Sequence, residues 1–242
     1  MLTKRSVRSW RVVAQPDRRE EANAERGGVE RIRDAAIELF GQHGVNGTSL
    51  KAIAERAGVS PALIIHHYGS KDGLRVACDQ YVADTLLALK TDAVRQGPRL
   101  DPVMLTSQIA EFRPLMRYLA KTLVDGSPHV NDLIDKMVEH AEQYTEEGVA
   151  AGLVKPSANP RARVVVLFLF AMGSLVLHEH FKRLLGVDLI DGDEPPVAYL
   201  QAVLEIYCEG VLTPGTYQNV RSYLDQLEEQ SDPKGGSDDE RD

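Results

Sequence analysis

The sequence predicts an all-α protein. Through most of its 242 residues, apolar side chains recur at offsets of three and four, in segments rich in Ala, Leu, Glu and Arg. This spacing is typical of helices with one buried face. Aromatic residues make up only 6% of the chain, glycine and proline are not in excess, and no segment has the pattern of a strand. The hydrophobic content of 43% is enough to bury a sizeable core, so we expect a folded protein.

The first segment, residues 1–27, shows no helical periodicity and is basic at its start. Lys4, Arg5, Arg8 and Arg11 all precede the first acidic residue. We expect a flexible basic arm, which suits contact with phosphates or with a minor groove. A solvated tail without a partner is the alternative, and the sequence leaves both open.

The first clear helix is expected to begin at Gly28 and to end at Gly44. One of its faces is apolar and the opposite face is largely charged; the apolar face consists of Val29, Ile32, Ala36, Leu39 and Phe40. Such a stripe turns one side of a helix toward a core. We expect this helix to pack across the two short helices that follow and to hold their mutual angle.

Residues 48–74 form the stretch on which the functional prediction depends. Apolar residues at helical spacing over residues 50–57 predict a short helix, and Gly58 suits its end because glycine adopts left-handed backbone angles without steric cost. Ser60 and Pro61 suit the start of the next helix, since serine caps free N–H groups and proline tolerates the first turn. Two short helices around a glycine turn make a helix-turn-helix, the layout of many DNA-binding domains.

The rest of the chain is predicted to form longer helices separated by glycine, proline or acidic residues. The expected helices span residues 70–93, 101–125, 128–151, 160–185, 196–212 and 214–229. Pro114 suits a bend in the second of these helices, because proline clashes with the carbonyl four residues before it. Residues 187–196 are expected to form an acidic loop, and residues 230–242 an acidic disordered tail.

The segment from Val164 to Leu177 is apolar on nearly all sides. Its 14 residues are fewer than the roughly 20 that a membrane-spanning helix needs, which predicts a buried core helix. A helix of this composition must be covered on both sides. We expect its own domain to cover one side, and the helix at residues 199–211 together with a second subunit to cover the other. A central helix surrounded by its own chain is the alternative.

The net charge of −8 divides into two halves of opposite sign. Residues 1–75 carry 13 Lys and Arg against 9 Asp and Glu, whereas the remainder carries 15 against 27. Phosphates respond to nearby cations, because salt screens charges that lie beyond roughly 8 to 10 Å. The overall acidity therefore does not exclude DNA as a partner.

The two cysteines favour a cytoplasmic location. Cys78 and Cys208 lie in helical patterns and form no CxxC pair, so buried, reduced thiols are expected rather than a disulfide. The basic N-terminus lacks the apolar stretch of a signal peptide. We expect a cytoplasmic protein that does not associate with membranes.

Three motifs give the chain a resemblance to a known family. They are Phe40-x3-Gly44-x3-Thr48, then Ile53-Ala54-x2-Ala57-Gly58-Val59-Ser60, then His66-His67-Tyr68-x-Ser70-Lys71 with Leu74. Together they resemble the N-terminal signature of TetR-type transcriptional regulators. The resemblance implies a three-helix DNA-binding domain at residues 28–74 and a larger helical ligand-binding and dimerisation domain at residues 75–229. The arm at residues 1–27 and the tail at residues 230–242 flank them.

The resemblance also implies contacts with the DNA backbone. Thr48 and Ser49 begin the first helix of the motif, where hydroxyls and free N–H groups can bind a phosphate, and Lys51 adds a cation. His67 and Lys71 match two further phosphate-contact positions of the family. For both of these residues, simple solvation is the alternative.

The recognition helix begins at Ser60 and is implied to lie in the major groove. Its outward-facing residues are Pro61, Ala62, Leu63, Ile65 and His66. The chain departs from the family at Ile65, where tyrosine is usual, and at Tyr68, where phenylalanine is usual. Apolar side chains sense thymine methyl groups but cannot form bidentate bonds with purines. We therefore expect recognition through methyl contacts and DNA shape, with the arm or Lys51 contributing more than usual.

In this family the C-terminal helices hold a small-molecule pocket, whose occupancy separates the two DNA-binding domains of a homodimer. Candidates for its lining are adaptable or aromatic residues on core-facing stripes and one histidine: Phe112, Met116, Met137, His140, Tyr144, Phe168 and Met172. Each of them also suits a core position. By analogy, we expect a repressor released from a palindromic operator by a small hydrophobic or cationic effector, for example one exported by an efflux transporter.

No pattern of a catalytic or cofactor site stands out, so we predict that the chain is not an enzyme and holds no metal or cofactor. The motif HHxxxxDG at residues 66–73 is one residue longer than the HHxxxDG motif of condensation-type acyltransferases. His178 and His180 lie two residues apart, and on a helix they point away from each other. A second hypothesis is a small-molecule or partner-binding helical protein with only weak, non-specific DNA binding, which Ile65 and the acidic C-terminal half favour.

Overall fold

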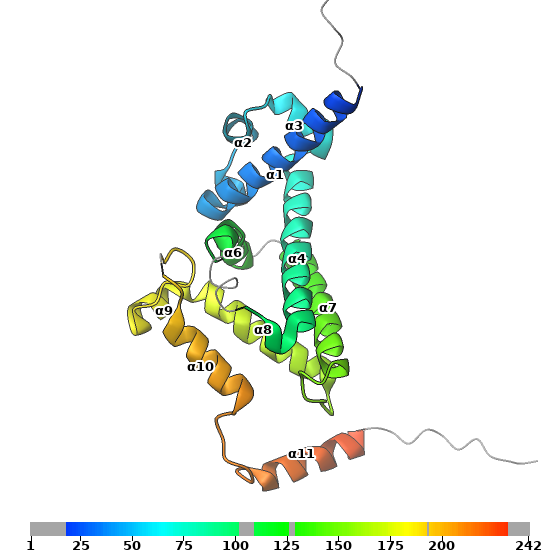
Figure 1. The fold of residues 1–242 in the computed structure, drawn as a ribbon, viewed down its shortest axis with the longest axis vertical. Helices are drawn as coiled ribbons and strands as arrows, with labels where there is room; N and C mark the ends of the chain where they lie inside the picture. Colours follow the sequence, from blue (N-terminus) through cyan, green and yellow to red (C-terminus); the bar gives the residue numbers. More distant parts are fainter. Residues whose placement is uncertain (1–17, 102–108, 126–128, 193, 232–242) are drawn as a thin grey trace, which may run out of the picture. The chain divides into compact units, whose positions relative to one another are not determined.

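The computed structural model describes residues 18–101, 109–125, 129–192 and 194–231 (Figure 1). Every regular element in this part of the chain is a helix, which confirms the all-α fold. The chain divides into two compact units, Met1–Pro195 and Pro196–Asp242. The second unit contains α10 (Val197–Cys208) and α11 (Gln218–Ser231).

The first unit contains the helix-turn-helix where the sequence predicts it. The helix α2 (Leu50–Ala57) follows its N-cap Ser49 and ends at Gly58, whose φ of 67° is left-handed. After the turn, α3 (Pro61–Tyr68) follows its N-cap Ser60. The local sequence therefore determines the start and end of both helices.

A single apolar core joins α1 (Arg18–Gly47), α2, α3 and the start of α4 (Lys71–Gln96). Its largest members are at most 1% exposed and include Phe40, Ile53 and Ile64. Tyr118 of α6 (Ile109–Leu123) is fully buried in the same core. The helix-turn-helix domain is thus completed by a helix from beyond residue 74.

Gly41 allows α1 and α6 to approach each other closely. A Cβ atom at this position would lie 3.0 Å from the backbone nitrogen of Tyr118 and 3.2 Å from the Cβ of Arg117. The rings of Phe40 and Tyr118 also meet, with centroids 6.4 Å apart. Because α6 packs directly on α1, the compact unit continues past Leu74 without a break.

A second core lies between α4, α6, α7 (His129–Ala150) and α8 (Pro160–Val176). Figure 1 shows α4 and α7 side by side, which agrees with their extensive packing. Leu119, Leu133 and Phe168 are among its buried members, and Leu86 of α4 packs against both cores. The two cores therefore share α4 and α6.

The bounds of several helices differ from the expected ones. The first helix begins at Arg18 instead of Gly28, so residues 18–27 are helical, and residues 1–17 of the expected arm lie outside the described part. Its regular geometry breaks at Gly44, with φ 74° and ψ 165°, where the sequence predicts its end. Pro114 lies within α6, and residues 102–108 of the helix expected over residues 101–125 are also outside the described part.

The long helix expected over residues 160–185 is two helices. The helix α8 ends at Val176, and α9 (His178–Leu185) begins after Leu177 at an angle of 73°. Leu177 is not helical at this break, with φ −99° and ψ 19°. None of the described helices is by itself long and apolar enough to cross a membrane, although the bent pair α8 and α9 meets that test of length and composition together.

Two expectations about burial are corrected by the structure. Cys78 is buried, but Cys208, the last residue of α10, is exposed, and both thiols are free. In α8, Val164 and Phe168 are buried whereas Phe170 is 70% exposed. The helix therefore has one covered face and one face that the other described residues of the first unit leave largely open.

Candidate nucleic-acid interface and effector sites

Ser49 and Ser60 hold the N-termini of α2 and α3 in place. The Oγ of Ser49 accepts a hydrogen bond from the backbone N–H of Ala52 at 3.1 Å, and that of Ser60 accepts one from Leu63 at 3.3 Å. Both serines are exposed. Since a helix N-terminus carries partial positive charge, both ends are suited to bind a phosphate.

Thr48 lies in a different environment from the one that the resemblance implies. Its side chain is buried, and its Oγ1 lies 2.8 Å from the carbonyl oxygen of Gly44 and 3.2 Å from that of Leu39. The hydroxyl thus donates to the end of α1 and ties it to the start of α2. This geometry favours a structural role over the expected phosphate contact.

Lys71 also bonds within the protein. Its Nζ donates to the carbonyl oxygens of Val45 at 2.9 Å and Thr48 at 3.1 Å, which fastens the start of α4 to the end of α1. An ammonium group has three donors, so one N–H remains for a phosphate. The expected DNA contact of Lys71 stays a prediction. The structure adds a second role for this side chain, which is to hold the start of α4 against the end of α1.

His67 is partly buried beside His66. The two rings meet edge to face with centroids 5.1 Å apart. The Nε2 of His67 is buried and has no hydrogen-bond partner among the described residues. A phosphate contact through this nitrogen requires the ring to turn, so the role of His67 also stays a prediction.

The exposed surface of α3 is small and largely apolar. Pro61, Ala62, Ile65 and His66 are exposed, as the sequence predicts, with Ile65 at 45%. Leu63 differs, because it is partly buried and packs against the core of the helix-turn-helix domain. This surface can contact base edges through methyl groups but offers few hydrogen-bond donors.

Lys51 of α2 is an exposed cation with only a weak partner. Its side chain is 80% exposed, and its Nζ lies 3.8 Å from a carboxylate oxygen of Glu55. An exposed pair at this distance holds a lysine only weakly. Lys51 is therefore available to a phosphate, in agreement with its expected role.

Tyr68, where the family usually has phenylalanine, locks α3 onto α1. Its hydroxyl donates to the carbonyl oxygen of Val29 at 2.9 Å. Burial, the largest cause, raises the pKa of Tyr68 from its ordinary 10.0 to about 12. The phenol thus acts as a neutral hydrogen-bond donor that stabilises the position of the recognition helix.

The residues expected to line an interior effector pocket lie in or beside the second core. Met137 and Phe168 are buried at 7% exposure, and Met172 packs against them. The other four are partly buried: Phe112, Met116, His140 and Tyr144. None of the seven lines either of the two hollows described next, so the interior pocket stays a prediction.

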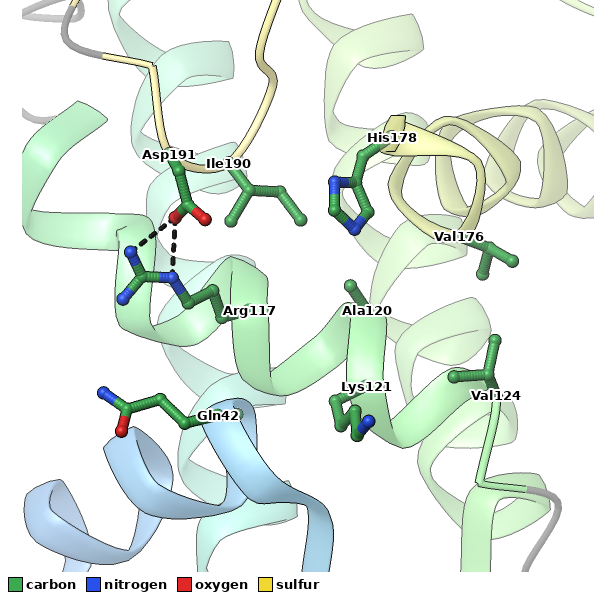
Figure 2. Close-up of a pocket in the computed structure, with 10 residues that line it drawn as sticks. Gln42, Arg117, Ala120, Lys121, Val124, Val176, His178, Ile190 and Asp191 are labelled. Carbon is green, nitrogen blue, oxygen red and sulfur yellow. Dashed lines mark hydrogen bonds and ion pairs between the residues drawn. The ribbon is translucent and has the colours of Figure 1, made fainter. Parts of the chain in front are cut away.

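The larger hollow, of about 430 Å³, lies at the junction of α1, α6 and α9 (Figure 2). The loop that follows α9 closes one side of it, and Arg117 of α6 pairs there with Asp191, with an Nη2 to Oδ1 distance of 2.5 Å. No sequence motif predicts this site, since its segments lie far apart in the chain. A smaller hollow of about 310 Å³ lies beside η1 (Gly97–Arg99) and the end of α7.

Metal-ligating side chains do not gather in the described part of the chain: no three His, Cys, Asp or Glu residues lie close enough to hold an ion there. His178 instead lines the larger hollow. Its Nδ1 is 3.7 Å from a carboxylate oxygen of Glu179, its neighbour in the chain.

Both parts of the chain match known protein families. Residues 32–78 match the model of bacterial regulatory proteins of the tetR family, and residues 110–213 match that of the tetracyclin repressor-like C-terminal domain. The HTH-type transcriptional regulatory protein RaaS of Mycobacterium tuberculosis is 48% identical over 151 residues, which cover 61% of this chain and 69% of RaaS. The chain belongs to the TetR family. This TetR-family protein is accordingly a DNA-binding transcriptional regulator.

Further relatives agree with the TetR fold. The transcriptional regulator BetI of Burkholderia ambifaria is 36% identical over 69 residues, which cover 27% of this chain and 36% of BetI. The crystal structure of the transcriptional regulator FadR from Bacillus subtilis, solved in complex with stearoyl-CoA, superposes with a TM-score of 0.52. It covers 76% of this chain and 99% of FadR at 16% sequence identity. At this identity the likeness is one of fold.

Proposed function

We propose that this TetR-family protein is a cytoplasmic, homodimeric repressor, which a small molecule bound to its C-terminal helices releases from a palindromic operator. The observation that carries this proposal is the place of α6. This helix belongs to the helical C-terminal region, yet its Tyr118 is buried in the core of the helix-turn-helix domain. A shift of α6 must therefore move α1 or open that core.

Tyr118 connects three helices at this point. Its ring meets Phe40 of α1, and its hydroxyl donates to a carboxylate oxygen of Asp79 in α4 at 2.5 Å. Burial raises the pKa of Asp79, and it also raises that of Tyr118. A buried hydrogen bond of this kind transmits displacement, because leaving either partner unpaired is costly. In this proposal, the effector binds one of two arrangements of α6 on α1 more tightly than the other. Its binding shifts the affinity for DNA by that difference in binding free energy, commonly about 1 to 3 kcal/mol.

The open face of α8 supports a homodimer. Val166, Leu169 and Phe170 are 47%, 51% and 70% exposed, and they lie on one side of a helix whose other side is in the second core. Exposed apolar patches of this size mark interfaces. The helix α10 also carries exposed apolar residues, among them Leu204 and Ile206. In this proposal, the apolar faces of α8 and α10 are covered when a second copy binds.

The interior core supports an effector that is largely apolar. Met137, Phe168 and Met172 offer a flexible, polarisable surface between α7 and α8. FadR from Bacillus subtilis was solved with stearoyl-CoA, a ligand that combines a long apolar chain with a charged group. A hydrophobic effector agrees with both observations, and control of an efflux transporter is part of the proposal.

Operator binding tests the proposal directly. A labelled DNA fragment from upstream of the gene for this protein is titrated at physiological salt, with fluorescence anisotropy as the readout. We expect specific binding that unlabelled copies of the fragment compete away and unrelated DNA does not. The control variant is Ala62→Glu, which places a negative charge on the exposed face of α3. It should abolish binding while circular dichroism shows an unchanged melting curve.

The same titration separates the proposal from the second hypothesis. A partner-binding helical protein would show only salt-sensitive binding that every DNA competes for equally. The apolar face of α3, with Ile65 at its centre, is the observation that favours this outcome. Binding that unlabelled copies of the fragment compete away and unrelated DNA does not, and that is lost in Ala62→Glu, would exclude the second hypothesis.

A further inference from the structure

The hollow between α1, α6 and α9 is partly open to solvent, and it is lined by described residues of the first unit. Gly41 and Gln42 of α1 form its floor, α6 and the α8–α9 junction form two walls, and the loop after α9 forms the third. In Figure 2, Ile190 and His178 lie next to each other above Ala120 of α6. The hollow is separate from the interior core that contains Met137 and Phe168.

The loop wall is held rigidly. Asp188 accepts hydrogen bonds from the backbone N–H groups of Ile190 at 3.1 Å and Asp191 at 2.8 Å, and from Nζ of Lys182 at 2.9 Å. These bonds, that of Asp191 first, lower the pKa of Asp188 to about 2, so the carboxylate is always charged at neutral pH. Ile190 is only 3% exposed. The loop therefore forms a preorganised wall of the hollow.

Two arginines of α6 join this loop to the helix. Arg117 donates through Nη2 and Nε to Asp191 Oδ1, at 2.5 and 2.6 Å, and Arg113 donates to the carbonyl oxygen of Gly192. The pairing neutralises Arg117 and also engages Asp191, the one carboxylate among the described residues that line the hollow. An incoming cation would thus find no unpaired carboxylate among these described residues.

The remaining polar groups favour an anion. Lys121 makes no ion pair with any described residue, and its Cε lies beside Gly44, where an added Cβ would be 3.4 Å away. His178 and Gln42 add hydrogen-bonding groups at the same hollow. The rest of the lining, including Val124 and Val176, is apolar. A ligand that matches this surface has one negative group for Lys121 and a short apolar body for the valines.

We propose that this hollow is a second effector site, which binds a small amphipathic carboxylate with its negative group at Lys121. A volume of about 430 Å³ is in the range of small-molecule sites and suits a body of this size. The floor of the site is the C-terminal part of α1, next to the close contact of Gly41 with α6. Occupancy therefore changes the packing of α1 on α6, and through it the affinity for DNA. That last step rests on the function proposed above.

Calorimetry with octanoate tests the site without DNA. We expect one site per chain, and binding at least about tenfold weaker for octanamide and for octylammonium, because a charge-assisted hydrogen bond to Lys121 is lost or reversed. The variant Lys121→Gln should weaken octanoate binding by about the same factor. The matched control Lys155→Gln removes the same charge from an exposed position outside the hollow and should bind octanoate like the wild type.

A second variant fills the hollow instead of changing its charge. Val124 is 60% exposed at the rim, so Val124→Trp should fold normally and prevent octanoate binding. Three results would each overturn the site. They are equal binding of octanoate and octanamide, unchanged octanoate binding in both Lys121→Gln and Val124→Trp, and no binding of octanoate at millimolar concentration.

The effect on DNA is measured separately, by anisotropy with the operator fragment in the presence and absence of octanoate. We expect octanoate to change the affinity of the wild type by about fivefold or more, and to leave that of Val124→Trp unchanged. Calorimetric binding without a change in DNA affinity would overturn the coupling and leave the site. A protein that binds octanoate at the hollow but no specific DNA would instead overturn the proposed repressor function.

Discussion

The helix-turn-helix domain and α8 are both built from apolar helices, but they bury their side chains to different degrees. Phe40 of α1 is 1% exposed, whereas Phe170 of α8 is 70% exposed. In the first region, α1, α2, α3, α4 and α6 enclose each other within one chain. In the second, only one face of the helix reaches a core. The difference indicates that the DNA-binding part, together with α6, closes its core within one chain, whereas one face of α8 stays open for the second copy that we propose.

The largest expected effect comes from truncating these two phenylalanines to alanine. Phe40→Ala should lower the free energy of unfolding by about 3 to 5 kcal/mol, because it leaves a cavity in a closed core. Phe170→Ala should lower it by less than about 0.5 kcal/mol but raise the dimer dissociation constant by about tenfold. Urea unfolding at low protein concentration and sedimentation equilibrium measure the two quantities. Equal losses of stability would mean that the α8 face is covered within one chain.

The second comparison is between two lysines of the helix-turn-helix domain. Lys71→Met should lower the free energy of unfolding by about 2 kcal/mol, because the carbonyl oxygens of Val45 in α1 and of Thr48 just after α1 lose a charged donor. It should also lower the salt slope of DNA binding by about one unit if the third N–H contacts a phosphate. The matched variant Lys51→Met should leave thermal stability unchanged, since that side chain is 80% exposed. A purely phosphate-binding Lys71 would lose DNA affinity without losing stability.

A smaller effect is expected at Tyr68, and it depends on pH. Tyr68→Phe removes the bond to Val29 and should cost about 0.5 to 1.5 kcal/mol near neutral pH. The folded state holds the phenol proton more tightly than the unfolded chain does, with a pKa of about 12 against 10.0. The contribution of Tyr68 is therefore complete below pH 10 and is lost as the pH rises toward 12. Urea titrations between pH 8 and 12 should show a smaller decline for Tyr68→Phe than for the wild type.

Tyr118, whose pKa is also raised by burial, contributes to the same alkaline decline. The variant Tyr68→Phe should therefore reduce the decline and not remove it. Parallel curves for the variant and the wild type over this range would show that the bond between Tyr68 and Val29 is not maintained in solution.

The smallest expected effect is that of Lys51 on DNA binding. Lys51→Met should weaken binding about equally on all sequences and lower the salt slope by about 0.9, which corresponds to one phosphate contact. Anisotropy titrations at four salt concentrations give this slope. A change in sequence preference would place Lys51 at a base edge instead of at the backbone.

The helix-turn-helix was predictable from local sequence, because local groups determine its geometry. Gly58 permits the left-handed turn, and Ser49 and Ser60 cap the helices with their own side chains. These interactions reach at most a few residues along the chain, so a short motif contains all of them. The exposure of Ile65 and the burial of Ile64 follow from the same helical periodicity.

Other features depended on residues that are distant in sequence, and no local pattern could reveal them. Thr48 and Lys71 bond to carbonyl oxygens at the end of α1, so side chains expected at phosphates also hold the domain together. At the hollow beside α9, Arg117 bonds to Asp191, although the two residues lie 74 positions apart in the chain. Hydrophobic periodicity shows that a residue turns inward, but the partner that it meets is decided by how the helices pack. For this protein, local sequence was therefore enough for the helix-turn-helix, whereas the connection from α6 to α1 and the hollow beside α9 came from tertiary packing.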